Sequence, residues 1–176
     1  VLIFTWVFQL FISGIPLLII IFLIVAFPIF MILSYNHFNH VKLRIDSFLD
    51  GKTHQISKSL QSFESGGFWG KGPGEGFYKK SLPDAHSDFV FAVAAEEYGI
   101  LLCCLIVIIY GLIVFRSFLL SLRNSNLFFI ICVSGLAFQF GFQSLIHMAS
   151  NIDLIPTKGM TLPFLSYGGS SILASA

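Results

Sequence analysis

The chain alternates between long apolar runs and short polar stretches. The first apolar run has no Asp, Glu, Lys or Arg from Val1 to Val41, which is too long for one helix, because about 20 residues cross the hydrocarbon core of a bilayer. Gly14 and Pro16 predict a break within this run, since glycine commonly ends helices and proline is tolerated in the first turn of the next one. We therefore expect the end of one span before the break and a complete span after it, kinked at Pro28.

Three further apolar runs follow, separated by polar stretches. Their lengths suit membrane helices, so the sequence predicts an all-α, polytopic membrane helical bundle in a single membrane domain. The chain begins without a methionine and stops inside an apolar run, so we expect it to be a fragment of a larger protein. The predicted organisation is the end of a span at 1–12, spans at 16–35, 87–115 and 127–149, a long loop at 36–86, connectors at 116–126 and 150–161, and the start of a last span at 162–176.

Composition agrees with a membrane environment. Hydrophobic residues make up 56% of the 176 and charged residues 11%, against roughly 25% charged residues in a typical soluble domain. A formal net charge of +1 supplies no basic excess for binding a phosphate backbone, so we expect no nucleic-acid partner. The three cysteines lie in apolar runs without a paired spacing, so we expect them to serve packing.

The first half of the long loop can form a helix. Thr53 is a plausible cap, and Ile56, Leu60 and Phe63 recur at helical spacing. This pattern predicts an amphipathic helix, which would lie on the bilayer surface or be an ordinary surface helix.

The second half of the loop, residues 65–76, is too rich in glycine for a regular element. Two uses stay open for it. Its backbone N–H groups, together with Lys71, Lys79 and Lys80, could form a nest that binds a pyrophosphate. The same stretch could instead be a flexible hinge.

Asp88 begins the second complete span. On a helix, Asp88, Ala92, Ala95 and Gly99 would share one face, because their spacings of 4, 7 and 11 residues return to nearly the same direction. Asp88 would then stand at the wet end of a groove of small residues, where another helix or a lipid-linked ligand can approach closely. The alternative is that Asp88 caps the helix, and the two roles can coexist.

Further polar side chains lie inside the apolar runs. Glu96 and Glu97 stand about two turns inside their span, and we expect structural ion pairing for them, since a charge there needs a partner. The third span carries a polar stripe formed by Gln139, Gln143, His147 and Ser150, for which we expect interhelical hydrogen bonds. His37 and His40 have no further ligand nearby in the sequence, so no metal site is expected.

Three segments carry distinctive motifs: Leu82–Val93 (LPDAHSDFVFAV) with Glu96, Glu97 and Gly99; Leu154–Pro163 (LIPTKGMTLP); and Ser166–Ser171 (SYGGSS). Together they resemble the SEDS family (shape, elongation, division and sporulation), peptidoglycan glycosyltransferases that include FtsW, RodA and SpoVE. The resemblance runs in order over nearly the whole chain. Residues 156–163 are more similar to the FtsW division branch than to the RodA elongation branch.

The resemblance implies a fold of ten membrane helices in the bacterial cytoplasmic (inner) membrane, with the long loop on the extracytoplasmic side. Charge alone favours the opposite orientation, because the loop carries seven basic residues and the connector at 116–126 carries two. This bias weakens as loops approach about 60 residues. The orientation therefore follows from the resemblance.

The resemblance also implies an activity. The substrate would be lipid II, a disaccharide-peptide on a polyprenyl pyrophosphate, polymerised during septal cell-wall synthesis, with a class B penicillin-binding protein transpeptidase and other division proteins as partners. Asp88 matches the family's catalytic carboxylate. The expected substrate-binding residues are His86, Lys158, Lys71 and Ser166. A divalent cation could assist the departing pyrophosphate, although the sequence identifies no metal ligands.

Two departures from the family pattern affect the third span. His147 stands where the family usually has asparagine, and Ala149 where it usually has glycine. Two other functions also stay open: a lipid II flippase or transporter, with Asp88, Glu96 or His147 relaying protons or gripping the headgroup, and a noncatalytic scaffold for a division transpeptidase.

Overall fold

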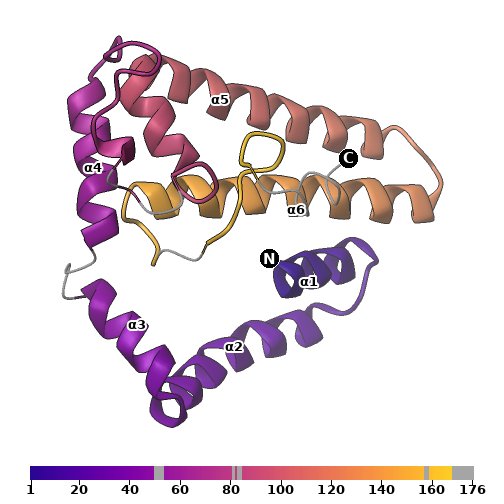
Figure 1. Ribbon diagram of the computed structural model, residues 1–176. Coiled ribbons are helices and arrows are strands. Elements are labelled where there is room, and N and C mark those ends of the chain that lie inside the picture. The colour runs from indigo at the N-terminus through magenta and orange to yellow at the C-terminus, as the bar shows by residue number, and fades with distance from the viewer. Residues whose placement is uncertain (50–53, 81, 83–84, 157–158, 168–176) are drawn as a thin grey trace. The chain divides into compact units, whose positions relative to one another are not determined.

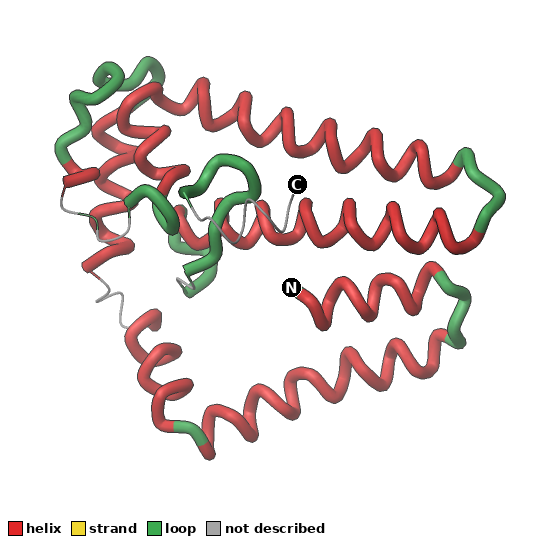
Figure 2. The backbone as a smooth tube through the Cα atoms, turned by 45° about the vertical axis from the view of Figure 1, so that its right-hand side comes forward, coloured by secondary structure: helices red, strands yellow, loops and turns green. Residues whose placement is uncertain are grey.

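The computed structural model describes residues 1–49, 54–80, 82, 85–156 and 159–167 (Figure 1). In that part of the chain there are helices and loops but no strand, as Figure 2 shows. The predicted all-helical class is therefore confirmed for these residues. In chain order the elements are α1 (Leu2–Ile12), α2 (Leu17–His37), α3 (Asn39–Leu49), α4 (His54–Gly66), the 3-10 helix η1 (Tyr78–Lys80), α5 (Val90–Leu122) and α6 (Leu127–Asn151).

Two of these helices, α5 and α6, are long and apolar enough to cross a membrane, and α1 and much of α2 form shorter apolar helices. Large apolar side chains on all four are exposed, including Phe22, Leu105 and Phe128. A helix that is apolar all round needs lipid or other helices as its surroundings. Together with the length and composition of α5 and α6, this makes the chain part of a membrane protein.

The chain breaks between α1 and α2 at the position predicted from Gly14 and Pro16. Gly14 has a φ of 80°, a left-handed conformation that glycine adopts without strain. Pro16 directly precedes the first residue of α2, a position where its missing N–H leaves no helical hydrogen bond unmade. Pro28 lies inside α2, as expected.

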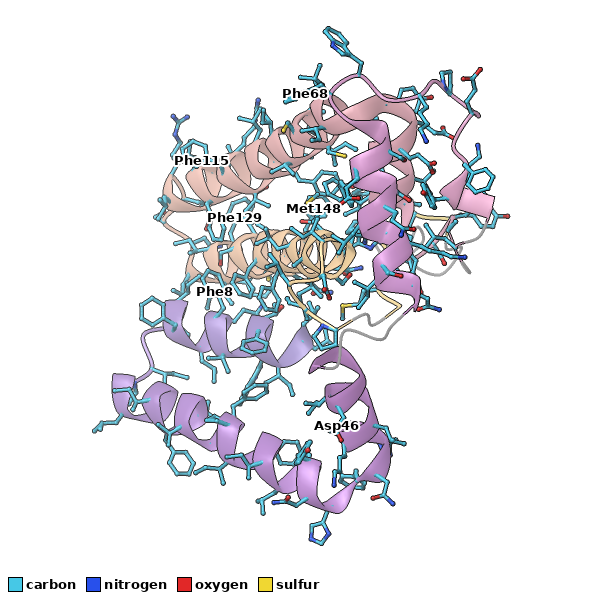
Figure 3. The ribbon with its side chains drawn as sticks, turned by 90° about the vertical axis from the view of Figure 1, so that its left-hand side faces the viewer. Phe8, Asp46, Phe68, Phe115, Phe129 and Met148 are labelled. Carbon is cyan, nitrogen blue, oxygen red and sulfur yellow. The ribbon has the colours of Figure 1, made fainter. Side chains whose placement is uncertain are left out.

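The chain forms two compact units, one of residues 1–51 with 113–140 and one of residues 52–112 with 141–176. Aromatic side chains pack the first unit. The ring of Phe8 in α1 stacks on Phe138 of α6 at a centroid distance of 4.3 Å and meets Phe118 of α5 edge to face (Figure 3). The Tyr35 hydroxyl donates a 3.0 Å hydrogen bond to Asp46 Oδ1, which joins α2 to α3.

The second unit has its apolar core at the start of α5. Leu82, Ala85, Phe89 and Ala92 are buried together, and Phe63 of α4 packs against them. The core therefore lies beside the segment that carries the Asp88 motif.

Helix α4 packs through small residues and through two members of the predicted apolar stripe, since Ile56 is buried and Phe63 packs against the core. Leu60, a member of that stripe, is exposed, whereas Ser59 is fully buried. The Ser59 hydroxyl donates a 2.6 Å hydrogen bond to the carbonyl of Asn151 at the end of α6. At the other end of α4, a side chain at Gly66 would overlap the carbonyl oxygen of Ala95 in α5. The helix is therefore packed against α5 and α6.

Helix α5 is bent where the sequence predicted one continuous span. Gly99 has φ 77° and ψ −179°, outside the helical region, so α5 consists of a short limb, residues 90–98, and a long limb, residues 100–122. The change of direction is visible in Figure 1. Glycine adopts this conformation freely because it has no Cβ.

Candidate functional site around Asp88

Asp88 lies in the turn directly before α5, and its side chain is partly buried. The connector after α6 returns to this turn, so that Gly159 lies against the carboxylate. A Cβ at Gly159 would stand 3.1 Å from Asp88 Oδ2. Two segments that are far apart in the sequence therefore meet at one acidic oxygen, and the close approach together with the positive φ of Gly159 favours glycine there.

Asn151 holds the backbone at Asp88 and at the first turn of α5. Its Nδ2 donates a 3.1 Å hydrogen bond to the Asp88 carbonyl, and its Oδ1 accepts a 3.3 Å hydrogen bond from the N–H of Ala92 in the first turn of α5. The side chain is fully buried. The start of α5 is therefore capped by a residue 59 positions away in the sequence, and among the described residues no first-turn N–H of α5 donates to the Asp88 carboxylate.

Ser166 holds the other side of the same turn. Its hydroxyl donates a 2.7 Å hydrogen bond to the Ser87 carbonyl and accepts one of 2.8 Å from the N–H of Leu162. The neighbouring Tyr167 N–H donates to the His86 carbonyl at 2.9 Å. Ser166 is buried, so in this structure the residue expected to bind substrate acts on the backbone that carries Asp88.

The polar stripe of α6 fixes the connector. Gln143 Nε2 donates a 3.0 Å hydrogen bond to the Thr161 carbonyl, and His147 Nδ1 pairs with the Met160 carbonyl. Because a carbonyl only accepts, His147 Nδ1 carries the proton. We expected these side chains to bond to another helix, but they bond to backbone that follows Gly159. They therefore help to hold Gly159 against Asp88.

The other residues expected to bind substrate are His86, Lys71 and Lys158, and they come from separate parts of the chain. His86 is exposed and lies two residues before Asp88. Lys71 is exposed on the glycine-rich loop, and its backbone N–H donates to the Glu96 carbonyl, about two helical turns along α5 from Asp88. Lys158 lies outside the residues that the structure describes.

Glu96 binds the glycine-rich loop through backbone N–H groups. Its carboxylate is fully buried and accepts hydrogen bonds from three successive backbone N–H groups, those of Phe77 (2.7 Å), Tyr78 (3.0 Å) and Lys79 (3.3 Å). For Glu96 the ion-pair expectation finds no support among the described residues. It is confirmed for Glu97, which pairs with Lys79 Nζ at 2.5 Å.

The same contacts contradict the pyrophosphate nest. The N–H groups of Lys71 and Gly72 donate to the carbonyls of Glu96 and Glu97, both at 3.0 Å. These donors are used within the protein, so they are not presented to an anion. The hinge alternative also finds no support at this point, because the loop is hydrogen-bonded to the bend of α5.

Asn151 is the site residue that the sequence interpretation missed. A signal for it existed, since Asn151 lies four residues after His147 and so shares its helical face. Its role could not be read from that spacing, because both of its partners in α5 come from a distant part of the sequence.

Chemically, the Asp88 site presents one partly buried carboxylate whose backbone is held from two sides. Such a group can accept a proton from a bound hydroxyl. Among the described residues, no group of three or more His, Cys, Asp or Glu side chains is placed to hold a metal ion.

Comparison with known proteins finds a family that matches the whole chain. A family model described as "Cell cycle protein", covering FtsW, RodA and SpoVE, matches residues 1–176. A protein named "Probable peptidoglycan glycosyltransferase FtsW" from Caulobacter vibrioides is 42% identical over 144 residues, which cover 80% of this chain and 37% of that protein. A protein of the same name from Thiomicrospira cyclica is 39% identical over 177 residues, covering 94% of this chain and 45% of that protein.

A solved structure is also similar, with a TM-score of 0.74 and 27% sequence identity, covering 95% of this chain and 48% of that one. It is described as "Structural coordination of polymerization and crosslinking by a peptidoglycan synthase complex". The chain spans less than half the length of each of these relatives.

Proposed function

The chain belongs to the FtsW, RodA and SpoVE family of cell cycle proteins, and we propose that the complete protein is a peptidoglycan glycosyltransferase that polymerises lipid II for septal wall synthesis in bacterial division. The observation that carries this proposal is the arrangement at Asp88. Asn151 supplies the cap of α5, which leaves the Asp88 carboxylate beside Gly159 for chemistry. The names of the relatives support the choice of reaction.

In the proposed reaction Asp88 is the general base. An oxygen of the acceptor sugar attacks the anomeric carbon of the lipid-linked donor, while the bond from that carbon to the pyrophosphate oxygen breaks. The proton of the acceptor hydroxyl passes to the Asp88 carboxylate. Because pyrophosphate leaves as an anion without protonation, one carboxylate suffices where glycosidases use two.

The charge that develops on the pyrophosphate needs a positive partner. Lys158 is our first candidate because it directly precedes Gly159, which lies against Asp88. Lys71 is second, since its position about two turns along α5 suits a more distant part of the substrate. A divalent cation is the third. We assign His86, which is exposed beside Asp88, to contact with the acceptor, and Ser166 to the position of the turn.

We place the protein in the bacterial inner membrane as a multi-pass protein of ten helices, with residues 36–86 in an extracytoplasmic loop. The apolar helices α5 and α6 support a membrane location. A class B penicillin-binding protein transpeptidase is the proposed partner. The description of the similar solved structure, which couples polymerization to crosslinking in a synthase complex, supports such a partner.

The test is polymerisation of lipid II by the purified full-length protein with its transpeptidase partner in detergent. Asp88→Asn should lower the rate by about 10²- to 10⁴-fold, the typical contribution of a general base. Thermal stability should stay unchanged, since asparagine keeps the size of the side chain. Normal glycan chains from this variant would remove Asp88 from the mechanism.

Asp153→Asn is the matched control, because it makes the same acid-to-amide change near the end of α6. Asp153 has a φ of 62°, which asparagine tolerates. We expect it to keep normal polymerisation. Detergent also separates the enzyme from a transporter: headgroup movement across sealed vesicles by a protein that forms no polymer in detergent would favour the transporter.

A further inference from the structure

Helix α5 changes character at Gly99. On the short limb Ala92 and Ala95 are buried, whereas Ile100 and Leu101 at the start of the long limb are exposed. The long limb covers residues 100–122, and at a rise of 1.5 Å per residue it is about 34 Å long, enough to cross a hydrocarbon core of about 30 Å. The long limb is therefore long enough to cross the membrane from the bend onward.

The glycine-rich loop is attached to this bend through its backbone. The N–H of Ile100 donates a 2.9 Å hydrogen bond to the Gly67 carbonyl. A Cβ at Gly99 would stand 2.6 Å from the backbone nitrogen of Gly70 and would overlap the Phe68 carbonyl oxygen. The turn of residues 67–70 is thus held in direct contact with the N-terminal end of the long limb.

This turn presents two aromatic side chains outward. Phe68 is 71% exposed and Trp69 is 84% exposed, and Tyr98 beside the bend is 48% exposed. Figure 3 labels Phe68 on the loop next to the start of the long limb. Lys71, also exposed, follows two residues after Trp69. We call Phe68 and Trp69 the aromatic tip.

The composition and the place of the aromatic tip identify what covers it. Aromatic rings with a neighbouring lysine are enriched where a membrane meets water, because the rings sit at headgroup level and the lysine extends to the aqueous side. The tip is also continuous with the exposed apolar residues Ile100 and Leu101. We propose that the aromatic tip is embedded in the lipid headgroup region and sets the depth of the α5 bend in the bilayer.

The tip costs little ordering entropy when it inserts, because the loop is already held on α5 by the Ile100 hydrogen bond and by the Glu96 carboxylate. The depth of the bend also determines where the short limb begins. Since Asp88 precedes that limb, the tip fixes the level of the candidate site relative to the lipid surface.

Fluorescence of Trp69 in the full-length protein tests this proposal. The protein and its Trp69→Phe variant are reconstituted in vesicles of phosphatidylcholine and phosphatidylglycerol, and the difference between their spectra isolates Trp69. Nitroxide-labelled lipids probe two depths of the bilayer, and aqueous iodide probes exposure to water. We expect the Trp69 signal to lose most of its intensity to a shallow nitroxide, less to a deep nitroxide and little to iodide.

Two results would overturn the proposal. Strong quenching by iodide with none by either nitroxide would place Trp69 in water. Protection from all three quenchers would mean that another protein segment covers it. Trp6→Phe is the matched control, since Trp6 is exposed on the apolar helix α1 and its difference spectrum shows that the nitroxides reach a second site.

A second variant tests the attachment of the tip. In Gly70→Ala the new Cβ would overlap the Glu97 carbonyl oxygen, whereas Gly67→Ala meets nothing within 4 Å, and both positions have positive φ. Gly70→Ala should raise iodide quenching of Trp69 and lower quenching by the shallow nitroxide, relative to Gly67→Ala. Equal quenching in both variants would show that attachment to α5 does not place the tip.

Discussion

Two acidic residues near the start of α5 have opposite environments. The Glu96 carboxylate is fully buried and accepts hydrogen bonds from three backbone N–H groups of the glycine-rich loop. At Asp88 it is the backbone carbonyl that is held, by Asn151, while the partly buried carboxylate lies beside Gly159. Glu96 therefore holds the glycine-rich loop on α5, whereas the proposed role of Asp88 is chemical.

This difference bears on why we propose Asp88, and not Glu96, as the general base. A carboxylate that accepts several N–H groups is held in a single position, because those bonds must break before it can move. Such a group is a poor general base, since it must give up those bonds to take a proton. When the neighbouring backbone carries the structural bonds, the side chain keeps its capacity to accept a proton.

Among the variants predicted here, Glu96→Ala should lose the most stability, and it tests the structural side of the difference between Glu96 and Asp88. The variant would leave three loop N–H groups without their acceptor, at a cost of about 3 kcal/mol or more, since each unsatisfied buried group costs about 1–3 kcal/mol. Thermal unfolding in detergent and proteolysis of residues 65–80 should both report the loss. A fully stable variant with an intact loop would contradict a structural role for Glu96.

Asn151→Ala should cost about 2 kcal/mol, because the Ala92 N–H and the Asp88 carbonyl would lose their partner. Polymerisation should fall as well, since the backbone of Asp88 is no longer held. Asn151→Asp separates the two effects: it keeps an acceptor for Ala92 but cannot donate to the Asp88 carbonyl. We expect this variant to retain more stability than activity, and full activity would show that Asn151 does not position Asp88.

Ser166→Ala should cost about 1–2 kcal/mol, because the Ser87 carbonyl and the Leu162 N–H both lose a hydrogen bond, and it should lower the polymerisation rate through the position of the Ser87 carbonyl. A positioning role predicts a fall in kcat with little change in KM. A rise in KM alone would instead indicate that Ser166 binds the substrate directly. Ser166→Thr, which keeps the hydroxyl, is the control and should recover part of the rate.

Lys79→Ala should have the smallest effect. It removes the ion pair with Glu97, whose side chains are both partly exposed, and such pairs contribute about 0.2–1 kcal/mol. Thermal unfolding at low and high salt measures it, and the difference between the variant and the parent protein should shrink as salt rises. An effect as large as that of Glu96→Ala would mean that the adjacent glutamates are not distinct in role.

Local pattern was sufficient for several features of this protein. The break at Gly14, the helical character of the apolar runs and the ion pair of Glu97 could all be predicted from neighbouring residues. The motif around Asp88 was visible for the same reason, since its residues are contiguous. These features depend on the backbone preferences of individual residues and on how favourably their side chains leave water. Both can be read from residues that are close together in the sequence.

Three features could not be predicted in this way: the packing of Ser59 against α6, the cap that Asn151 supplies to α5, and the bend at Gly99. In each, a polar or small residue is placed by a partner far away in the sequence, 92 positions for Ser59 and Asn151 and 59 positions for Asn151 and Ala92. Hydropathy shows that a buried polar group needs a partner but does not identify it.

The order of amino acids therefore established a helical membrane chain, the break between its first two helices and the residue type of the candidate base. The folded arrangement established that the Glu96 carboxylate is bound to backbone donors and that Gly159 lies against the Asp88 carboxylate. The physical reason is that hydrophobic burial follows composition along the chain, whereas the state of a carboxylate depends on the donors that the fold brings within hydrogen-bonding distance.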